Sequence, residues 1–374
     1  MSTTKKIVLI GPVYPYKGGI SHYTGLMCRA LSDHYDITML SYKLQYPNFL
    51  FKKEQKNYDN NKFQIQDTKY KINTINPINW LTTASYIKKL KPDYIILQWW
   101  HPYFSPCYIT LSLFTRKIKK LFICHNVLPH ERFFLDQFLT RNVLKYGSGF
   151  ILHSETDKAD LLSLLPNAIC EVTPHPTYNT FRLNNLSSDN ARKHLHLPQD
   201  KKLLLFFGLV REYKGLKYLL KSMPLIRKEL PDIHLIIAGD FGNSYPEYQT
   251  LINDLKLDCL SIINEYIPDT DVEYYFSACD LVVLPYESAT QSGVIQIAYG
   301  FDKPVVVTDV GGLPEVVTNN KTGYIIPPCD SISLSNAVID FFTQNRAADF
   351  SSNIQKESYR FSWTHMVEKI QALL

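Results

Sequence analysis

The sequence lacks the features that mark several classes of protein. Its seven cysteines stand singly among 374 residues with no CxxC pair, which excludes a disulfide framework and argues against zinc or redox dithiols. No apolar run approaches the ~18 residues of a membrane-spanning helix, and the four aliphatic residues before Gly11 are too few for a signal sequence. We therefore expect a reduced, cytoplasmic protein that is at most peripheral at the inner face of the membrane.

Acidic residues are scarce in the first half of the chain. Residues 1–180 hold 22 Lys and Arg against 12 Asp and Glu, whereas residues 181–374 hold 18 against 23. The chain is long enough for about two domains of 100–200 residues each. The two halves are therefore expected to meet different partners.

Short β-branched runs alternate with helical patterns along almost the whole chain, which is typical of an α/β fold with parallel sheets. Two sets of about six strands predict two doubly wound, Rossmann-like domains, at 1–180 and 190–360. The Pro- and Asn-rich stretch 174–200 has the composition of a linker, and the Lys-, Asn- and Tyr-rich stretch 42–70 is interpreted as an inserted loop or a short hairpin. The predicted strands are 6–10, 36–40, 93–99, 120–124, 149–152, 171–173, 202–207, 234–238, 259–263, 281–284, 304–308 and 324–326.

Polar residues follow the predicted strands, where the ligand crevice of a parallel sheet lies. Gly18 and Gly19 come after the first strand and open a helix, so their N–H groups are free to approach an anion; a plain tight turn is the alternative. His125 follows the fourth strand, and it is either a functional or a structural histidine. His153 is followed by Ser154, for which we favour a helix cap.

The second half carries a stronger signal of anion binding. Gly208 ends an apolar strand, and Arg211 and Lys214 precede the amphipathic helix at 216–228. Cations are unfavourable in the first turn of a helix, so a phosphate is the better explanation for them than a solvated surface pair. Glu287 follows another strand, with Ser292, Gly293 and Val294 opening the next helix.

The segment Asp269-Thr270-Asp271 has the form of a metal-binding Asp-x-Asp motif. However, Thr270 with Glu273 three residues later also has the form of a capping box. We favour the cap, and we expect no metal.

Together these residues resemble the retaining glycosyltransferases of family 4, within the glycosyl transferases group 1. The resemblance covers nearly the whole chain. Its most specific part runs from Ala278 through Glu287 to Gly300, Pro304 and the stretch 311–317. It implies the GT-B fold, in which two Rossmann-like domains face a cleft and the last helix, 361–374, packs back on the first, acceptor-side domain.

The resemblance also implies roles for single residues. Arg211 and Lys214 would neutralise the pyrophosphate of a nucleotide sugar, UDP- or GDP-linked, and the Gly18 and Gly19 amides would approach its distal phosphate. Glu287 would accept hydrogen bonds from the sugar hydroxyls, and His125 would lie near the reacting carbon. The acceptor would be a glycan or a lipid-linked glycan of the cell surface, and no further cofactor is implied.

One position departs from the family pattern. The family commonly has a second glutamate that contacts the ribose, and this chain has Ile295 there. Gln296 or Ser292 would have to take over that contact. Two alternatives therefore stay open: a sugar-nucleotide 2-epimerase of the same fold, and a binding protein without turnover. An NAD dehydrogenase is disfavoured because the GxGxxG fingerprint is missing.

Basic residues gather beside apolar ones in the first half. Arg116, Lys117, Lys119 and Lys120 follow the apolar stretch 108–114, and Lys88, Lys89 and Lys91 close the preceding helix. This pattern suits an anionic membrane surface, although solvated helix ends are the plainer reading. Nucleic acid is not expected, since no recognised binding motif accompanies the charge.

Overall fold

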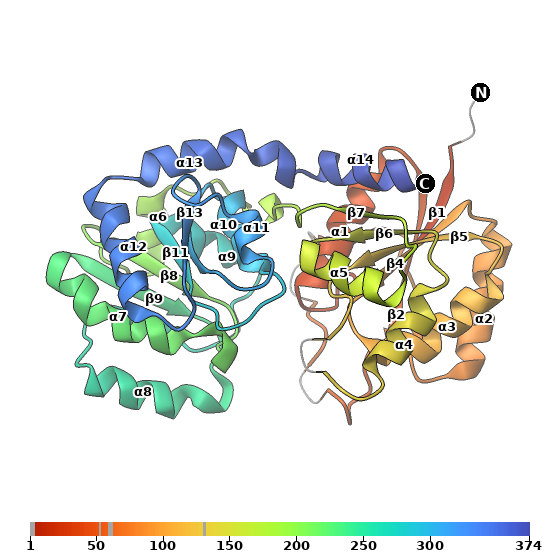
Figure 1. The fold of residues 1–374 in the computed structure, drawn as a ribbon, viewed down its shortest axis with the longest axis horizontal. Coiled ribbons are helices and arrows are strands. Elements are labelled where there is room, and N and C mark those ends of the chain that lie inside the picture. The colour runs from red at the N-terminus through yellow and green to blue at the C-terminus, as the bar shows by residue number, and fades with distance from the viewer. Residues whose placement is uncertain (1–3, 52–53, 59–62, 130–131) are drawn as a thin grey trace. The chain divides into compact units, whose positions relative to one another are not determined.

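The computed structural model describes residues 4–51, 54–58, 63–129 and 132–374, and it divides the chain into two units. Unit 1 comprises residues 1–174 and 362–374, and unit 2 comprises residues 175–361 (Figure 1). The chain thus returns to unit 1 with its last helix. In the part of the chain that is described, no helix is both long and apolar enough to cross a membrane.

Unit 1 is a seven-stranded sheet in which every recorded strand pair is parallel, in the order β3-β2-β1-β4-β5-β6-β7. Its strands are β1 (Lys6–Ile10), β2 (Asp36–Leu44), β3 (Lys69–Asn73), β4 (Tyr94–Trp99), β5 (Lys119–Cys124), β6 (Gly149–Leu152) and β7 (Cys170–Val172). The central strands are apolar on both sides because helices cover both faces of the sheet.

The two faces of the unit 1 sheet have separate cores. Leu9, Ile96 and Ile123 pack against α1 (Gly19–Ser32) and α14 (Trp363–Leu373). The residues that alternate with them, among them Ile10 and Leu97, pack against the remaining helices. Those helices are α2 (Pro77–Leu90), η2 (Pro102–Phe104), α3 (Ser105–Phe114), α4 (Asp136–Leu144) and α5 (Glu155–Leu164).

Unit 2 has a six-stranded parallel sheet in the order β10-β9-β8-β11-β12-β13. Its strands are β8 (Lys202–Phe207), β9 (Ile233–Ala238), β10 (Leu260–Ile263), β11 (Leu281–Leu284), β12 (Val305–Thr308) and β13 (Gly323–Ile326). The connecting helices are η3 (Asn179–Phe181), α6 (Ser188–His194), η4 (Glu212–Lys214), α7 (Leu216–Glu229), η5 (Gly242–Ser244), α8 (Tyr245–Asp254), α9 (Val272–Ala278), α10 (Gly293–Gly300), α11 (Leu313–Val316), α12 (Ser331–Thr343), α13 (Ala347–Lys356) and η6 (Ser358–Phe361).

Strand order reverses once in each sheet. In unit 1, β2 and β3 lie on one side of β1, and β4 to β7 lie on the other side. The switch therefore lies between β1 and β4. In unit 2 it lies between β8 and β11. Doubly wound sheets bind ligands outside the carboxyl ends of the strands at this switch. The Gly18–Gly19 loop follows β1, and the Gly208–Gly215 segment follows β8, so both predicted motifs start from switch strands.

Three expectations need correction. The strand β3 at the end of the predicted insertion was missed, because it is an edge strand whose side chains are mostly exposed and only Ile72 is buried. Parts of that stretch, 52–53 and 59–62, lie outside the described residues. The boundary between the units falls after Pro174, so 175–180 belong to unit 2. The last helix begins at Trp363 rather than 361, and Phe361 packs within unit 2 against Tyr299.

Candidate functional site

The segment that follows β8 is locked against the end of β11. Gly215 has φ +65, and a Cβ added there would lie 1.9 Å from the carbonyl oxygen of Pro285, so no other residue fits without displacing backbone. In addition, the Glu287 N–H donates to the Tyr213 carbonyl at 2.7 Å. The two segments at the switch point of unit 2 are therefore held together by backbone contacts.

Lys214 is the last residue of η4 and is partly buried in this junction. Its Nζ lies 5.7 Å from the ring centroid of Tyr286 and 3.1 Å from the position that a Cβ on Gly208 would take. Burial lowers the pKa of Lys214, and the nearby Arg211 lowers it further. No described residue forms an ion pair with Lys214, so its charge is desolvated without a protein counter-ion.

Arg211 is a second cation at the same junction. It lies at the residue before η4, and its Nη1 donates to its neighbour's carbonyl, that of Val210, at 2.8 Å. Within the described residues no carboxylate pairs with its guanidinium. The structure therefore brings Arg211 and Lys214 together as the sequence predicts, and both are open to an anion.

Glu287 does not stand alone, because Lys217 in the first turn of α7 forms an ion pair with it at 2.8 Å. The hydrogen bond to Glu287 raises the pKa of Lys217 above its ordinary value. Sequence reasoning missed Lys217. The signal was present, since Lys217 is a third cation in the same short segment. Of the three, only Lys217 lies in the first turn of α7, because Arg211 precedes η4 and Lys214 ends it.

The helix α10 starts at Gly293 beside this junction. Its N-cap residue, Ser292, makes no side-chain cap, and its Oγ lies 3.3 Å from the Tyr286 hydroxyl. An uncapped helix start presents backbone N–H groups to a ligand. Ser292, Gly293 and Val294 therefore lie at the start of α10, and their contact with a donor stays a prediction.

The two residues that follow raise a difficulty for the expected ribose contact. The side chains of Ile295 and Gln296 are each only 1% exposed. The Gln296 amide points into the protein interior of unit 2, and its Oε1 has no described hydrogen-bond partner. A ribose contact through Gln296 stays a prediction that requires this amide to become accessible.

The capping box predicted at 269–273 is wrong. The N-cap of α9 is Asp271 without a side-chain cap, and the Thr270 hydroxyl donates to Asp271 instead. Glu273 is fully buried, and its carboxylate accepts backbone N–H bonds from residues 183, 184 and 186 of the linker. The described residues contain no group of three His, Cys, Asp or Glu side chains able to hold a metal.

Unit 1 has an uncapped helix at its own switch point. Gly18 precedes α1 with φ +106, and neither a side-chain cap nor an acidic residue occurs in the first turn. Both Gly18 and Gly19 are exposed. The start of α1 thus has two exposed glycines and no acidic residue in its first turn, and binding of an anion there stays a prediction.

His125 is buried rather than exposed at the surface. It follows β5, is 8% exposed, and its Nε2 is 2.7 Å from the Oε1 of Gln98. Tyr23 packs edge-on against it at 4.6 Å between ring centroids. His153 stands beside it, and the cap predicted at Ser154 is confirmed, because the Ser154 side chain accepts the Asp157 N–H.

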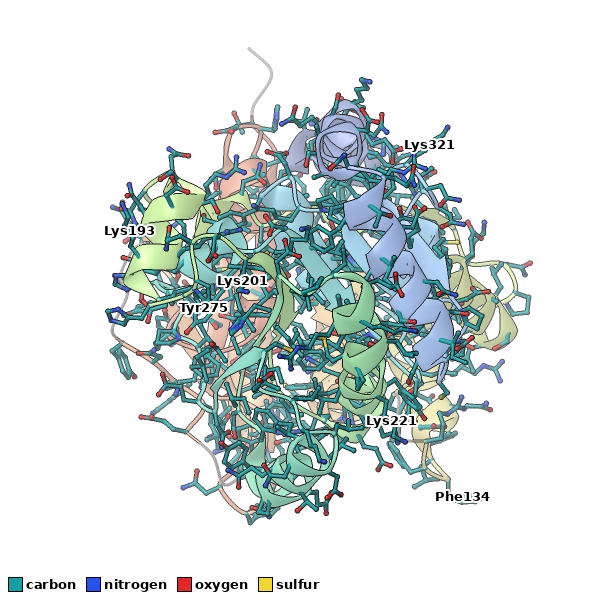
Figure 2. All side chains as sticks on the ribbon, turned by 90° about the vertical axis from the view of Figure 1, so that its left-hand side faces the viewer. Phe134, Lys193, Lys201, Lys221, Tyr275 and Lys321 are labelled. Atoms are coloured by element: carbon teal, nitrogen blue, oxygen red, sulfur yellow. The ribbon has the colours of Figure 1, made fainter. Side chains whose placement is uncertain are left out.

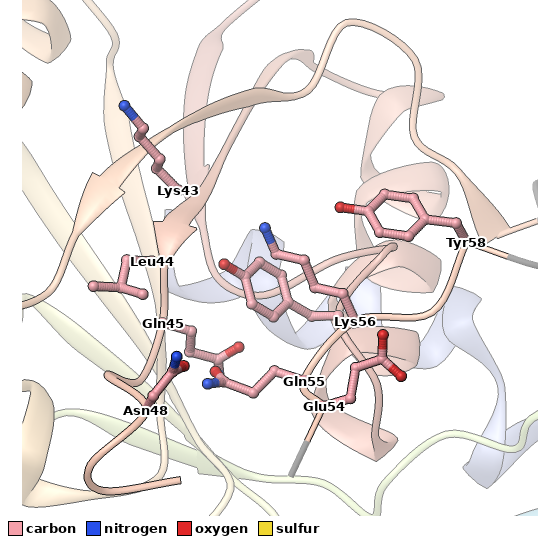
Figure 3. A pocket seen from close by; sticks show the side chains of 9 residues that line it. Lys43, Leu44, Gln45, Asn48, Glu54, Gln55, Lys56 and Tyr58 are labelled. Atoms are coloured by element: carbon pink, nitrogen blue, oxygen red, sulfur yellow. The ribbon is translucent and has the colours of Figure 1, made fainter. Parts of the chain in front are cut away.

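A cavity of about 730 Å³ lies next to the Gly18–Gly19 loop in unit 1 (Figure 3). Its lining combines amides, aromatic rings, two lysines and one carboxylate, that of Glu54, which pairs with Lys17 at 3.6 Å. The lining residues are Tyr16, Lys43, Leu44, Gln45, Asn48, Glu54, Gln55, Lys56 and Tyr58. The Nζ of Lys56 lies 5.0 Å from the Tyr16 ring centroid. Sequence reasoning missed this cavity, because its residues are scattered through the stretch interpreted as an insertion.

Comparison with known proteins gives a family for most of unit 2. Residues 187–358 match the family model described as glycosyl transferases group 1. D-inositol 3-phosphate glycosyltransferase of Gordonia bronchialis is 27% identical over 241 residues, which are 61% of this chain and 52% of that protein. Lipopolysaccharide 1,2-N-acetylglucosaminetransferase of Salmonella typhimurium is 24% identical over 230 residues, 59% of this chain and 58% of that one. The chain thus spans about half the length of the curated relatives it matches.

Solved structures match over almost the whole chain. Sucrose-phosphate synthase from Thermosynechococcus elongatus aligns with a TM-score of 0.76 at 19% identity, covering 99% of this chain and 98% of that one. Anabaena HepE in complex with UDP aligns with a TM-score of 0.75 at 17% identity, covering 98% of each chain. The chain has the GT-B fold of these neighbours, and its residues 187–358 match the family model of the glycosyl transferases group 1.

Proposed function

We propose that the protein is a retaining glycosyltransferase that moves a sugar from a nucleoside diphosphate sugar to a hydroxyl acceptor. One observation carries the proposal: among the described residues, no carboxylate pairs with Arg211 or Lys214 at the switch point of unit 2. A desolvated ammonium costs free energy in the unliganded protein, which a bound diphosphate offsets. The Anabaena neighbour in complex with UDP supports a nucleotide ligand for this fold.

The charges at this junction suit the departing diphosphate. In the reaction the bond between the anomeric carbon and the diphosphate oxygen breaks, and negative charge grows on that oxygen. In this proposal Arg211, Lys214 and the uncapped start of α10 stabilise this charge electrostatically. We therefore infer that transfer needs no metal ion.

Glu287 has a different role in this proposal. Its ion pair with Lys217 holds the carboxylate at the end of β11, next to Tyr286 and the helix start. A fixed carboxylate accepts hydrogen bonds from sugar hydroxyls and so orients the anomeric carbon. Retention then follows from attack of the acceptor hydroxyl on the face that the phosphate leaves, with the phosphate oxygen taking the hydroxyl proton. A role for His125 and the Gly18–Gly19 amides near the reacting groups stays a prediction.

We assign acceptor recognition to the cavity beside the Gly18–Gly19 loop. Its amides suit sugar hydroxyls, its tyrosine rings suit sugar C–H faces, and its two lysines suit an anionic group (Figure 3). Phe49, Leu50 and Phe51, which follow Asn48 of its lining, are exposed apolar residues. A polar cavity beside apolar side chains fits an amphiphilic, lipid-linked glycan of the cell surface.

Product analysis tests this function. The protein is incubated in EDTA with UDP-, GDP- and ADP-sugars, with and without a lipid-linked glycan acceptor, and the products are resolved by NMR. We expect sugar transfer that depends on the acceptor and keeps the anomeric configuration of the donor. Conversion of the donor alone to its 2-epimer would establish the isomerase instead, and binding without turnover of any donor would establish a binding protein.

A matched pair of variants ties the activity to the site. Lys214→Met removes the unpaired charge and is expected to abolish transfer. Lys221 is an exposed lysine of α7 (Figure 2). The control variant Lys221→Met is expected to keep transfer. Equal activity of the two variants would refute the assignment of the donor site.

A further inference from the structure

Acidic residues are almost absent from a long part of unit 1. Between Asp67 and Glu131 the sequence holds nine Lys and Arg residues but only one acidic residue, Asp93. A carboxylate oxygen of Asp93 already accepts the Lys6 N–H at 2.8 Å. Helices α2 and α3 lie in this part of the chain and pack against each other. The helix pair therefore bears an excess of positive charge with hardly any compensation.

The ends of α2 and α3 enclose a cavity of about 600 Å³. Four cations line it, Lys88, Lys91, Arg116 and Lys117, together with Leu113 and Phe114. All six side chains are exposed, Leu113 by 46% and Phe114 by 48%. Among the described residues none of the four cations has an ion-pair partner. The lining of the cavity thus combines cationic and apolar side chains.

The structure corrects one member of the predicted basic cluster. Lys120 is 2% exposed, and its Nζ donates to the carbonyls of Thr115 and Ile118 at 2.8 and 2.9 Å. It therefore stabilises the turn between α3 and β5 from inside and does not take part in the surface. Lys88 and Lys117, on opposite sides of the cavity lining, are the better probes of that surface.

We propose that this cavity is a docking site for an anionic phospholipid bilayer. Lipid phosphates accept hydrogen bonds from the four cations, and Leu113 and Phe114 enter the boundary between headgroups and acyl chains. The positive charge of the helix pair complements an anionic surface, which argues for this occupant over a neutral protein face. The inference goes beyond the proposed transfer reaction and does not depend on it, because docking needs no donor.

A second exposed apolar segment provides an internal comparison. Phe134 is 98% exposed in unit 1 and lies at the start of α4 (Figure 2). The adjacent Arg132 is already paired with Asp136. Charge complementarity to lipid is therefore missing at Phe134, and we assign no bilayer contact to it.

Co-sedimentation of the full chain with vesicles tests the proposal. Vesicles contain phosphatidylcholine alone or with phosphatidylglycerol, at low and at physiological salt. We expect binding only with phosphatidylglycerol, weakening as salt rises because the attraction is screened over a Debye length of ~8 Å at physiological ionic strength. Equal binding to both vesicle types, or binding to neither at low salt, would overturn the proposal.

Two pairs of variants locate the contact. Lys88→Gln with Lys117→Gln is expected to weaken partition onto anionic vesicles about 30-fold, since each cation near such a surface contributes about a factor of five. Lys221→Gln with Lys321→Gln removes the same charge from unit 2 and is expected to leave partition unchanged (Figure 2). Equal weakening in the two pairs would mean a nonspecific charge effect and would refute the site.

The apolar contact has its own control. Phe114→Ala is expected to weaken partition several-fold, and Phe134→Ala is expected to leave it unchanged. The reverse result would move docking to the start of α4. If soluble glycerol phosphate binds with millimolar affinity while anionic vesicles do not bind, the cavity takes small anions and the bilayer proposal fails.

Discussion

Three lysines, one buried and two partly buried, show how neighbouring atoms determine the state of an ammonium group. The Lys120 ammonium has two carbonyl acceptors, and burial lowers its pKa to about 8. Lys217 is paired with Glu287, and this raises its pKa. Lys214 has neither kind of partner among the described residues, and burial lowers its pKa. Of these three lysines, Lys214 is therefore the one whose charge a bound anion would stabilise.

This difference predicts the effect of Lys214→Met on the unliganded protein. Because the pKa of Lys214 is lower in the folded than in the unfolded chain, its protonation favours unfolding below its ordinary pKa. Removing the charge should leave the melting temperature equal or higher at neutral pH. Binding of a nucleoside diphosphate should fall about 10- to 150-fold, as for loss of a hydrogen bond to a charged group. A variant that melts earlier and binds normally would contradict this account.

Replacement of Glu273 should lower the free energy of unfolding without affecting the transfer reaction. Its buried carboxylate accepts the N–H groups of Leu183, Asn184 and Leu186. In Glu273→Gln an amide NH2 group, which can only donate, replaces a carboxylate oxygen that accepts backbone N–H groups. This change should cost about 2–3 kcal/mol of unfolding free energy. Urea denaturation measures this, with the exposed Glu247→Gln as control. Equal stability of the two variants would show that the linker is held by other contacts.

His153 predicts how stability depends on pH. Burial lowers the pKa of His153 to about 4, while its Nδ1 lies 2.9 Å from the Thr173 carbonyl. The unfolded chain then binds the proton more readily, so this stability is complete above pH 6.5 and is lost as pH falls toward 4. His153→Asn keeps a donor for Thr173 but does not titrate. Its stability should change less over that range, and an unchanged pH dependence would count against the assignment.

At the scale of the element, two glycines that follow neighbouring strands of unit 2, Gly215 after β8 and Gly242 after β9, have different surroundings. Gly215 and Gly242 both have positive φ, +65 and +58. A Cβ on Gly215 would meet the Pro285 carbonyl at 1.9 Å, whereas a Cβ on Gly242 would lie 3.7 Å from Nη1 of Arg211, an ordinary van der Waals contact that needs no displacement. The first glycine is therefore required by contact as well as by conformation.

Alanine at each position separates these two effects. Gly242→Ala should cost only the left-handed conformation, about 1–2 kcal/mol, and nucleotide binding should persist. Gly215→Ala must also push η4 away from the end of β11, so it should lose more stability and most of the nucleotide affinity. Calorimetric titration of the two folded variants measures this. Similar affinities would mean that the position of η4 does not matter.

The success of prediction from sequence also follows the kind of element. All twelve predicted strands exist, because buried parallel strands are continuous apolar runs such as 202–207. The edge strand β3 and the burial of Gln296 depend on partners that are distant in sequence, and no local pattern indicates them. The cap at Thr270 failed for the same reason, since Glu273 is recruited by the linker 90 residues before it.

At the scale of the whole molecule, unit 1 depends on a helix from the opposite end of the chain. Met366, Val367 and Ile370 of α14 fill one face of the unit 1 sheet, against Tyr23 and neighbouring residues. Lys369 also pairs with Glu171 at 3.0 Å. The last 13 residues are thus part of the core of unit 1, although unit 2 precedes them in the chain.

Truncation of a buried side chain of α14 should therefore destabilise unit 1 and not unit 2. Ile370→Ala should lower its unfolding free energy by about 2–5 kcal/mol, whereas the exposed Gln371→Ala should change it little. Differential scanning calorimetry follows both units if they melt separately, and a nucleoside diphosphate should raise the transition of unit 2. An effect of Ile370→Ala on the nucleotide-sensitive transition alone would contradict the assignment of α14.

Calorimetric titration with nucleoside mono- and diphosphates is the most direct test of the central claim. This claim is that unit 2 binds a nucleoside diphosphate through Arg211 and Lys214, which have no carboxylate partner among the residues that the structure describes. UDP, GDP and ADP are compared with their monophosphates in EDTA, on the wild type and on Lys214→Met. We predict that one diphosphate binds at least tenfold more tightly than its monophosphate, and that Lys214→Met removes this difference. Equal affinity for diphosphate and monophosphate, or a preference that survives in Lys214→Met, would contradict the account.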